Sequence, residues 1–308
     1  MLLYTHPACL AHDPGPGHPE CPPRLATVLA ALDQPLFAAA IEYREAPRAD
    51  TAPILRAHER SLFDRVMQPV AAGDHRRLDA DTAMSEHSAE ATLRAIGALI
   101  AAVDAVMAGE ARHAFCATRP PGHHATRERA MGFCPLNGIA CAALHAVHAH
   151  GLERVAVVDF DVHHGNGTEA ILASDPRTLY VSSHQWPLYP GTGSEPRMGN
   201  AVNAILPPGS GPIAFRDAWS KTLLQALDAF APQLVLVSAG FDAHRLDPLA
   251  NLNLGAEDYA WITTELAAIA DRHAEGRLVS TLEGGYSLTA LKESVRAHVG
   301  ALLDTHSP

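Results

Sequence analysis

The feature that most constrains the fold is a set of short apolar runs in which apolar and polar residues do not alternate. Parallel strands that are covered by helices on both faces have this pattern. Helical patterns lie between most of the runs, and this order predicts βαβ units and a largely parallel α/β sheet with helices on both faces. The predicted strands cover residues 113–118, 154–159, 178–182, 233–238 and 277–282. The predicted helices cover residues 87–109, 137–150, 213–231, 257–274 and 288–304.

The sequence contains enough apolar residues for one large core. It has 308 residues, of which 47% are hydrophobic and 19% are charged. Because neither a Gly/Ser-rich linker nor a repeat divides the sequence, we expect a single domain over residues 1–308. No apolar run is long enough to span a membrane, and residues 1–6 do not resemble a signal peptide.

Charge and cysteine content restrict the partners and the compartment. The formal net charge of −11 disfavours nucleic-acid binding, which needs a basic face, and weakly favours cationic substrates. The cysteines form no CxxC pair and their number is odd, so we expect a reducing cytoplasm and no disulfide framework. No segment indicates an oligomeric state. The cysteines are Cys9, Cys21, Cys116, Cys134 and Cys141.

Four predicted strands run directly into segments rich in histidine, acidic residues and glycine. In an open α/β sheet, ligands bind outside the carboxyl ends of the strands. We therefore expect the four segments to meet at one rim. The segments are RPPGHH at 119–124, DFDVHHGNG at 159–167, AGFDAH at 239–244 and EGGY at 283–286.

Two acidic residues and a histidine in these segments predict a metal site. Asp161 and His163 are two residues apart at a strand end, so their side chains point the same way, and Asp242 can supply a third ligand. This set suits zinc or a similar divalent ion and leaves room for water and substrate. Asp161 and His163 could instead cap a helix that begins near Gly165. We prefer the metal, because clustered carboxylates repel one another unless a cation lies between them.

The tandem histidines His123 and His124 follow a rigid Pro-Pro-Gly turn. Beside a metal-activated water they fit a proton-transfer pair, because imidazole titrates near neutrality. For an isolated pair, one buried and one solvated histidine would be the simpler interpretation. Asp159 could orient one ring and Asn166 the other.

Tyr286 follows two glycines, which would let the backbone approach a ligand closely. Its phenol could donate a hydrogen bond to a developing oxyanion, and the alternative is an aromatic anchor for the last helix. The four segments contain no serine, cysteine or lysine nucleophile with an obvious base. We therefore predict attack by metal-activated water without a covalent intermediate.

The ordered motifs resemble the histone deacetylase family, which includes class II deacetylases, bacterial homologues and acetylpolyamine amidohydrolases, and which shares the arginase-like α/β fold. The resemblance extends over nearly the whole chain. The motifs are HPE at 18–20 with RL at 24–25, RPPGHHA at 119–125, GFCPLNG at 132–138, DFDVHHGNGT at 159–168, SSH…YPGTG at 182–193, SAGFDAH at 238–244 and EGGYS at 283–287.

The resemblance implies a role for each matching residue. Asp161, His163 and Asp242 match the zinc ligands of the family. His124 matches the proton shuttle of the tandem pair, and Tyr286 matches the tyrosine that polarises the scissile carbonyl.

Two further residues match the partners of the tandem histidines. Asp159 matches the carboxylate behind His123. Asn166 stands where some members have aspartate, which is similar to the class II pattern, and a neutral partner should raise the pKa of His124 less than a carboxylate would.

The resemblance also implies a structural monovalent cation, usually potassium. Its ligands would be Asp159 and oxygens near Asp161, His163, Ser182 and Ser183.

An apolar channel for the acyl-lysine stem is a further implication. Gly132 and Phe133 match one wall, and Tyr189 stands where the opposite wall is usually phenylalanine. Two aromatic faces would stabilise the methylene stem, although ordinary packing near the rim would also explain both rings. Leu249 matches a rim position that can be acidic in polyamine-specific relatives, so leucine here favours acyl-lysine.

Lysine deacylation is thus the leading hypothesis for the function, and hydrolysis of acetylpolyamines or another acylated small amine is the alternative. A binding protein without catalysis is disfavoured because every catalytic position is filled. A binuclear manganese enzyme is disfavoured because Asn166 stands where a further carboxylate would be needed. Asp79 or Asp81 could bind the substrate backbone, and Cys134 is interpreted as a small buried hydrophobe in preference to a redox-sensitive thiol.

Overall fold

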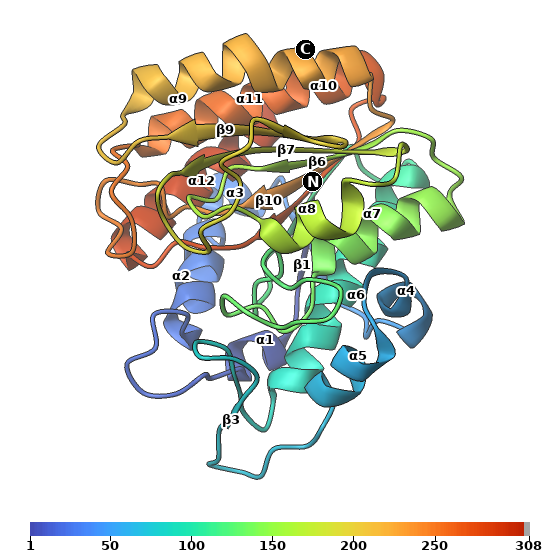
Figure 1. Cartoon of the computed structure of the whole chain (residues 1–308), viewed down its shortest axis with the longest axis vertical. Coiled ribbons are helices and arrows are strands. Elements are labelled where there is room, and N and C mark those ends of the chain that lie inside the picture. Colours follow the sequence, from blue (N-terminus) through green and yellow to red (C-terminus); the bar gives the residue numbers. More distant parts are fainter. Residues whose placement is uncertain (305–308) are drawn as a thin grey trace.

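A nine-stranded sheet with helices on both faces forms the centre of the computed structural model, which describes residues 1–304 (Figure 1). All neighbouring strands are parallel except β8 and β9. The predicted α/β class with a largely parallel sheet is therefore confirmed. In sheet order the strands are β2 (Glu42–Glu45), β1 (Leu2–Thr5), β5 (His113–Cys116), β11 (Leu278–Leu282), β10 (Leu234–Ala239), β6 (Val155–Asp159), β7 (Thr178–Gln185), β9 (Ala201–Leu206) and β8 (Arg197–Met198).

The five strands predicted from the sequence are the five central neighbours β5, β11, β10, β6 and β7. Every residue of these strands is buried, which is why their sequences do not alternate. The strands nearer the edges were not predicted. β2 has the polar sequence EYRE with largely exposed side chains, and Asn203 interrupts the apolar run of β9.

The long helices agree with the predicted ranges. They are α6 (Ser88–Met107), α7 (Gly138–Ala149), α11 (Ala256–His273) and α12 (Leu288–Asp304). The segment predicted as one helix over 213–231 contains α9 (Pro212–Ala218), a π-helical turn η1 (Trp219–Leu223) and α10 (Leu224–Phe230). At the start of this turn, buried Trp219 donates its indole N–H to the Ser183 hydroxyl at 3.0 Å.

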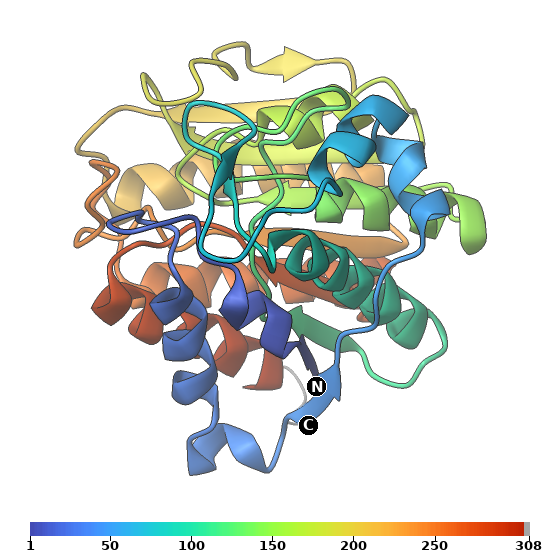
Figure 2. The same ribbon diagram turned by 90° about the horizontal axis from the view of Figure 1, so that it is seen from below.

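Several short elements were not predicted. They include α1 (Pro7–Ala11), α2 (Pro22–Leu32), α3 (Pro35–Ala38), α4 (Thr51–Ala57), α5 (Arg60–Val66) and a hairpin of β3 (Arg76–Arg77) and β4 (Ala83–Met84). The helix considered near Gly165 is present as α8 (Asn166–Leu172), with Gly165 and neither Asp161 nor His163 at its N-cap position. Helices α2 and α9 to α12 contribute to the apolar core on one face of the sheet, and α4 to α8 contribute to the core on the other face. Figure 2 shows α2 beside α12.

The strand registers bring the carboxyl ends of the central strands to the same edge of the sheet. The segments rich in histidine, acidic residues and glycine begin at these ends. Asp159 at the end of β6 lies opposite Ser238 in β10 and Ser182 in β7, and Ala239 in β10 lies opposite Leu282 in β11. Within residues 1–304, no helix is both long and apolar enough to cross a membrane.

Candidate active site

Asp161, His163 and Asp242 come together at the carboxyl ends of β6 and β10. One ligand atom from each lies within 4.8 Å of the others, and all three residues are buried. His163 Nδ1 is 3.1 Å from Asp161 Oδ1 and 3.2 Å from Asp242 Oδ2. The expected convergence of these three side chains is therefore found in the structure.

Backbone amides hold the two carboxylates in place. Asp161 Oδ2 accepts a hydrogen bond from Gly284 N at 2.8 Å, and Asp242 Oδ1 accepts one from Val162 N at 2.8 Å. Burial, followed by the nearby charge of Asp161, raises the pKa of Asp242 to about 7. Burial lowers the pKa of His163, but Asp161 and Asp242 more than reverse this and raise the pKa to about 10.

The three side chains fit a divalent cation. Burial and the neighbouring charge of Asp161 oppose ionisation of Asp242, and the two carboxylates favour a positive charge on His163. A donor set of one nitrogen and two carboxylates is one that zinc accepts. The residues could therefore hold zinc or a similar ion.

Glycines allow the carboxylates to reach this position. A Cβ atom at Gly240 would lie 2.0 Å from Asp161 Oδ2, and a Cβ atom at Gly284 would lie 2.0 Å from Asp242 Oδ2. Neither distance is compatible with a side chain. These two positions therefore need glycine for close approach.

The tandem histidines lie next to this cluster, and each has the partner expected for it. His123 Nδ1 is 2.9 Å from Asp159 Oδ2, and His124 Nδ1 is 2.9 Å from Asn166 Oδ1. Their ring centroids are 4.0 Å apart. Because both partner atoms are acceptors, Nδ1 carries the proton in each ring.

The environments of the two histidines push their pKa values apart. Burial lowers the pKa of His123, but the carboxylates of Asp159 and Asp161 raise it well above its ordinary value. Burial and the positive charges of His123 and His163 lower the pKa of His124 well below its ordinary value. His124 is therefore the neutral member of the pair, with a lone pair on Nε2.

Tyr286 is held from both sides. Its backbone N–H donates to Asp247 Oδ2 at 2.7 Å, and the Arg24 guanidinium carbon is 4.8 Å from its ring centroid. Arg24 also donates to the carbonyls of Gly285 and Glu283, each at 2.6 Å. Burial raises the pKa of the phenol well above its ordinary value, so the phenol stays protonated and can donate a hydrogen bond.

A buried ion-pair network fixes Arg24. Glu20 accepts hydrogen bonds from Arg24 Nη1 at 3.1 Å and from Arg119 Nη2 at 2.7 Å, and His12 Nε2 is 3.2 Å from its carboxylate. Burial raises the pKa of Glu20, but the charge of Arg119 and the contact with His12 lower it well below its ordinary value. The HPE motif and the arginine of the RPPGHH segment are thus joined in support of the Tyr286 loop.

Sequence reasoning assigned no role to Glu283 or Tyr180. Glu283 Oε2 accepts hydrogen bonds from Gly122 N at 2.7 Å and His123 N at 3.3 Å, which holds the tandem-histidine loop. The Tyr180 hydroxyl donates to Asp159 Oδ2 at 3.1 Å. Glu283 could have been found, because it is an acidic residue directly after a buried strand. Tyr180 could not, because it lies within an apolar strand.

A cavity of about 230 Å³ leads to His124, His163 and Tyr286. All four residues predicted for the channel line this cavity, and Leu188 and Asp81 were not among them. The complete lining is Asp81, His124, Gly132, Phe133, His163, Leu188, Tyr189, Leu249 and Tyr286.

The two candidates for binding the substrate backbone are separated in the structure. The Asp81 carboxylate accepts a hydrogen bond from Gly132 N at 3.0 Å beside the channel. Asp79 instead lies 3.8 Å from Arg129 and does not line the channel.

Of the residues expected around a potassium ion, Asp159 lies in β6, Ser182 and Ser183 lie in β7, and Asp161 and His163 lie in the segment that follows β6. Asp159 is opposite Ser182 in the strand register, and Ser182 Oγ is 2.9 Å from His184 Nδ1. Ser183 Oγ accepts a hydrogen bond from Trp219. Carboxylate, hydroxyl and carbonyl oxygens are donors that potassium accepts, so the residues are compatible with such an ion.

None of the five cysteines is in a disulfide bond. Cys134 is fully buried, and burial raises the pKa of its thiol well above its ordinary value. A protonated, inaccessible thiol agrees with the interpretation of Cys134 as a small hydrophobe.

The sequence is similar over most of its length to deacetylase proteins. The family described as the Histone deacetylase domain matches residues 18–302. An uncharacterized protein of Synechocystis sp. is 41% identical over 293 residues, which are 93% of this chain and 94% of the relative. The histone deacetylase-like amidohydrolase of Pseudomonas aeruginosa is 40% identical over 278 residues, which are 88% of this chain and 73% of the relative. The solved structure of the HDA15 HD domain has a TM-score of 0.91 at 32% identity and covers 98% of this chain and 88% of its own.

Proposed function

The chain belongs to the histone deacetylase family, and from this premise we propose that it is a zinc-dependent amidohydrolase that removes acyl groups from lysine side chains. The observation that supports the proposal is the arrangement at the inner end of the channel. Asp161, His163 and Asp242 meet there beside the neutral His124 and the protonated Tyr286.

Asp161, His163 and Asp242 would hold one zinc ion. Bound there, zinc would supply Lewis acidity that polarises the acyl carbonyl and lowers the pKa of a neighbouring water. Gly240 and Gly284 leave space for the two carboxylates that neutralise the ion.

The remaining steps follow from the protein side chains. The Nδ1–H group of His124 forms a hydrogen bond with Asn166 Oδ1, which leaves Nε2 free to accept a proton. His124 Nε2 would take this proton from the attacking water as the water oxygen bonds to the carbonyl carbon. Tyr286 would donate a hydrogen bond to the oxyanion that forms. As the C–N bond breaks, the proton would pass from His124 to the leaving amine, which gives a free amine and a carboxylic acid.

Asp159 and Glu283 would act through His123. Asp159 orients the His123 ring and favours its charged form, and Glu283 holds the backbone of the same loop. A cation at this position would stabilise negative charge as it develops on the substrate.

The channel supports an acylated lysine as the substrate. Phe133 and Tyr189 line it with aromatic rings suited to a methylene stem, and the rim position of Leu249 carries no acidic group, while Asp81 lies elsewhere in the lining. The second ammonium of a polyamine would therefore find no partner at that position.

We further propose a potassium ion beside Asp159 and Ser182, where oxygen donors gather. The continuous nine-stranded sheet supports a single catalytic domain, and the unpaired cysteines support a cytoplasmic location.

The experiment that tests the function compares purified zinc-loaded protein on matched acetyl-lysine peptides and N-acetylated polyamines. We expect peptide turnover that falls about 10²- to 10³-fold in Tyr286→Phe, because one oxyanion donor is lost. Tyr43→Phe, at an exposed tyrosine on the sheet edge, is the matched control and should retain full activity. A preference for polyamines would overturn the substrate assignment, and failure to hydrolyse either class would contradict the proposed function.

A further inference from the structure

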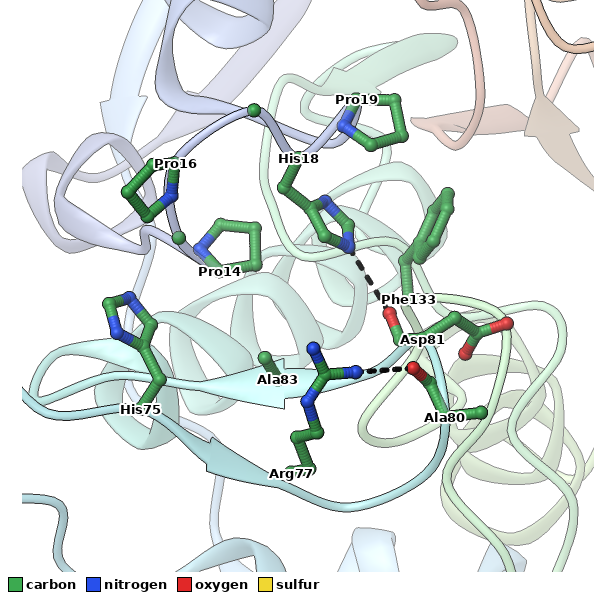
Figure 3. A pocket seen from close by; sticks show the side chains of 12 residues that line it. Pro14, Pro16, His18, Pro19, His75, Arg77, Ala80, Asp81, Ala83 and Phe133 are labelled. Atoms are coloured by element: carbon green, nitrogen blue, oxygen red, sulfur yellow. Dashed lines mark hydrogen bonds between the residues drawn. The ribbon is translucent and has the colours of Figure 1, made fainter.

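A second cavity, of about 590 Å³, opens beside the channel (Figure 3). Residues 14–19 form one wall, and the other comes from the β3–β4 hairpin with the turn between its strands. Asp81 and Phe133 line both this cavity and the channel. The cavity is therefore a groove that continues from the channel entrance, and we call it the rim groove.

The walls of the rim groove are largely apolar. Pro14, Pro16 and Pro19 present their rings to it, together with Phe133 (Figure 3). His18 ties the two walls together, because its Nε2 is 3.2 Å from the Asp81 carbonyl and its ring packs edge-on against Phe133. A groove that is already formed costs a ligand little ordering entropy.

Arg77 brings a positive charge into the rim groove. Its Nη1 donates to the Ala80 carbonyl at 2.5 Å, which fixes the guanidinium while its other N–H groups stay available (Figure 3). Among residues 1–304, no acidic side chain forms an ion pair with Arg77. His75 lies along the same wall.

The single acidic residue of the lining, Asp81, forms no ion pair with Arg77. Asp81 Oδ1 already accepts hydrogen bonds from Gly132 N at 3.0 Å and Thr82 Oγ1 at 2.9 Å. In Figure 3 its carboxylate lies on the side of Asp81 that is away from the Arg77 guanidinium. The rim groove thus presents an available cation on a protein whose net charge is −11.

We propose that the rim groove binds the peptide chain next to the acyl-lysine, and that Arg77 selects substrates with an acidic side chain close to that lysine. This inference rests on the proposed deacylase function and specifies its substrate class. An acidic group on the peptide would pair with Arg77, whereas the additional ammonium group of a polyamine would be repelled by it. Arg77 would thus be a specificity-determining residue.

The test uses acetyl-lysine peptides that differ only in carrying Glu, Gln or Lys at the positions flanking the acetyl-lysine. We expect the best Glu peptide to exceed its Gln counterpart in kcat/KM by about three- to tenfold, mostly through KM, because one exposed ion pair is gained. The Lys peptide should be the poorest. The ratio should fall as salt is raised, because salt screens exposed charges.

Variants of Arg77 test whether the preference for the Glu peptide depends on this side chain. Arg77→Gln should remove the difference between the Glu and Gln peptides, and Arg77→Glu should reverse the order so that the Lys peptide is preferred. Arg129→Gln is the matched control, because it removes another exposed arginine near the rim that does not line the groove. It should preserve the preference. Binding of intact peptides to Tyr286→Phe, measured by fluorescence anisotropy, should show the same ranking without turnover.

The outcomes separate the two proposals. Turnover of the Gln peptide without any preference for Glu would overturn the role of the rim groove and leave the deacylase function standing. A Glu preference that survives in Arg77→Gln would also overturn it. Failure of every peptide to bind or react would refute the deacylase function together with the inference that rests on it.

Discussion

Asp161 and Asp242 reach the same point because the backbone beside them carries no side chains. Gly240 and Gly284 are each positioned so that a Cβ atom would lie 2.0 Å from a carboxylate oxygen of the candidate metal cluster. At the residue scale, the site therefore depends on the glycines that make room for its carboxylates as well as on the carboxylates themselves.

A Gly284→Ala substitution tests this dependence. We expect zinc affinity to fall about 10- to 100-fold, because the added methyl group displaces Asp242 from the cluster. The measurement is a competition titration against a chromophoric chelator. Gly300→Ala, in α12 where an added Cβ would meet no atom within 4 Å, is the control and should bind zinc normally. Unchanged affinity in Gly284→Ala would show that the close approach is not required.

The residues that sequence reasoning identified are those whose position alone suggests chemistry. Asp161, His163 and Asp242 stand at strand ends, and a strand end is visible in the sequence as the point where an apolar run stops. Arg24 supports Tyr286 across a separation of 261 residues between donor and acceptor. No local pattern indicates such a contact, because it depends on how distant elements pack.

At the element scale, the central strands and long helices were predictable because burial fixes their composition. The edge strand β2 and strand β3 were not, since their side chains are mostly polar and accessible, and β4 was not because it is only two residues long. The rim groove lies between such weakly patterned segments. Its shape depends on the contact of His18 with the Asp81 carbonyl, which neither segment predicts alone.

His58 joins three elements behind the site. It caps α4, its Nδ1 donates to the Thr126 carbonyl at 2.9 Å, and its Nε2 accepts from Asn137 N, at the start of α7, at 2.8 Å. Burial lowers its pKa from 6.5 to about 4, despite the hydrogen bond to Thr126. The fold therefore requires the neutral imidazole.

The sign of the resulting pH dependence follows from proton uptake. Between pH 6.5 and pH 4 the unfolded chain binds a proton at His58 that the folded chain does not. The contribution of neutral His58 to the free energy of unfolding is therefore fully present above pH 6.5 and is lost as the pH falls toward 4. His58 should contribute about 2 kcal/mol to the loss of unfolding free energy between pH 7.5 and pH 5.

Urea unfolding at the two pH values measures this contribution. His58→Gln should be less stable than wild type at pH 7.5 but should lose about 2 kcal/mol less on going to pH 5. His148→Gln, at an exposed histidine of α7, should behave as wild type. An identical pH dependence in His58→Gln and wild type would contradict the assignment.

At the scale of the whole molecule, the sheet order explains why one rim carries the chemistry. The order β5, β11, β10, β6 brings together four strands from four separate regions of the chain, all parallel. Their carboxyl ends supply the tandem histidines, Asp161 with His163, Asp242 and Tyr286. Ligand sites of open α/β sheets lie at such a position.

The overall charge and the local charge have different effects. The net charge of −11 would attract cationic substrates over a distance, but salt screens this attraction beyond about 10 Å at 0.1 M. In the proposed role, Arg77 would act at contact distance on the groups beside the acyl-lysine. The overall charge would therefore attract cationic substrates, whereas Arg77 at the rim would favour acidic groups.

Zinc titration of chelator-treated protein tests most directly whether Asp161, His163 and Asp242 hold one catalytic ion. Turnover of an acetyl-lysine peptide should be absent after metal removal, rise linearly with added zinc and reach its plateau at one equivalent per chain. Asp242→Asn should need a large excess of zinc or remain inactive. Full turnover of the metal-free protein, or a plateau at two equivalents, would contradict a mononuclear zinc amidohydrolase.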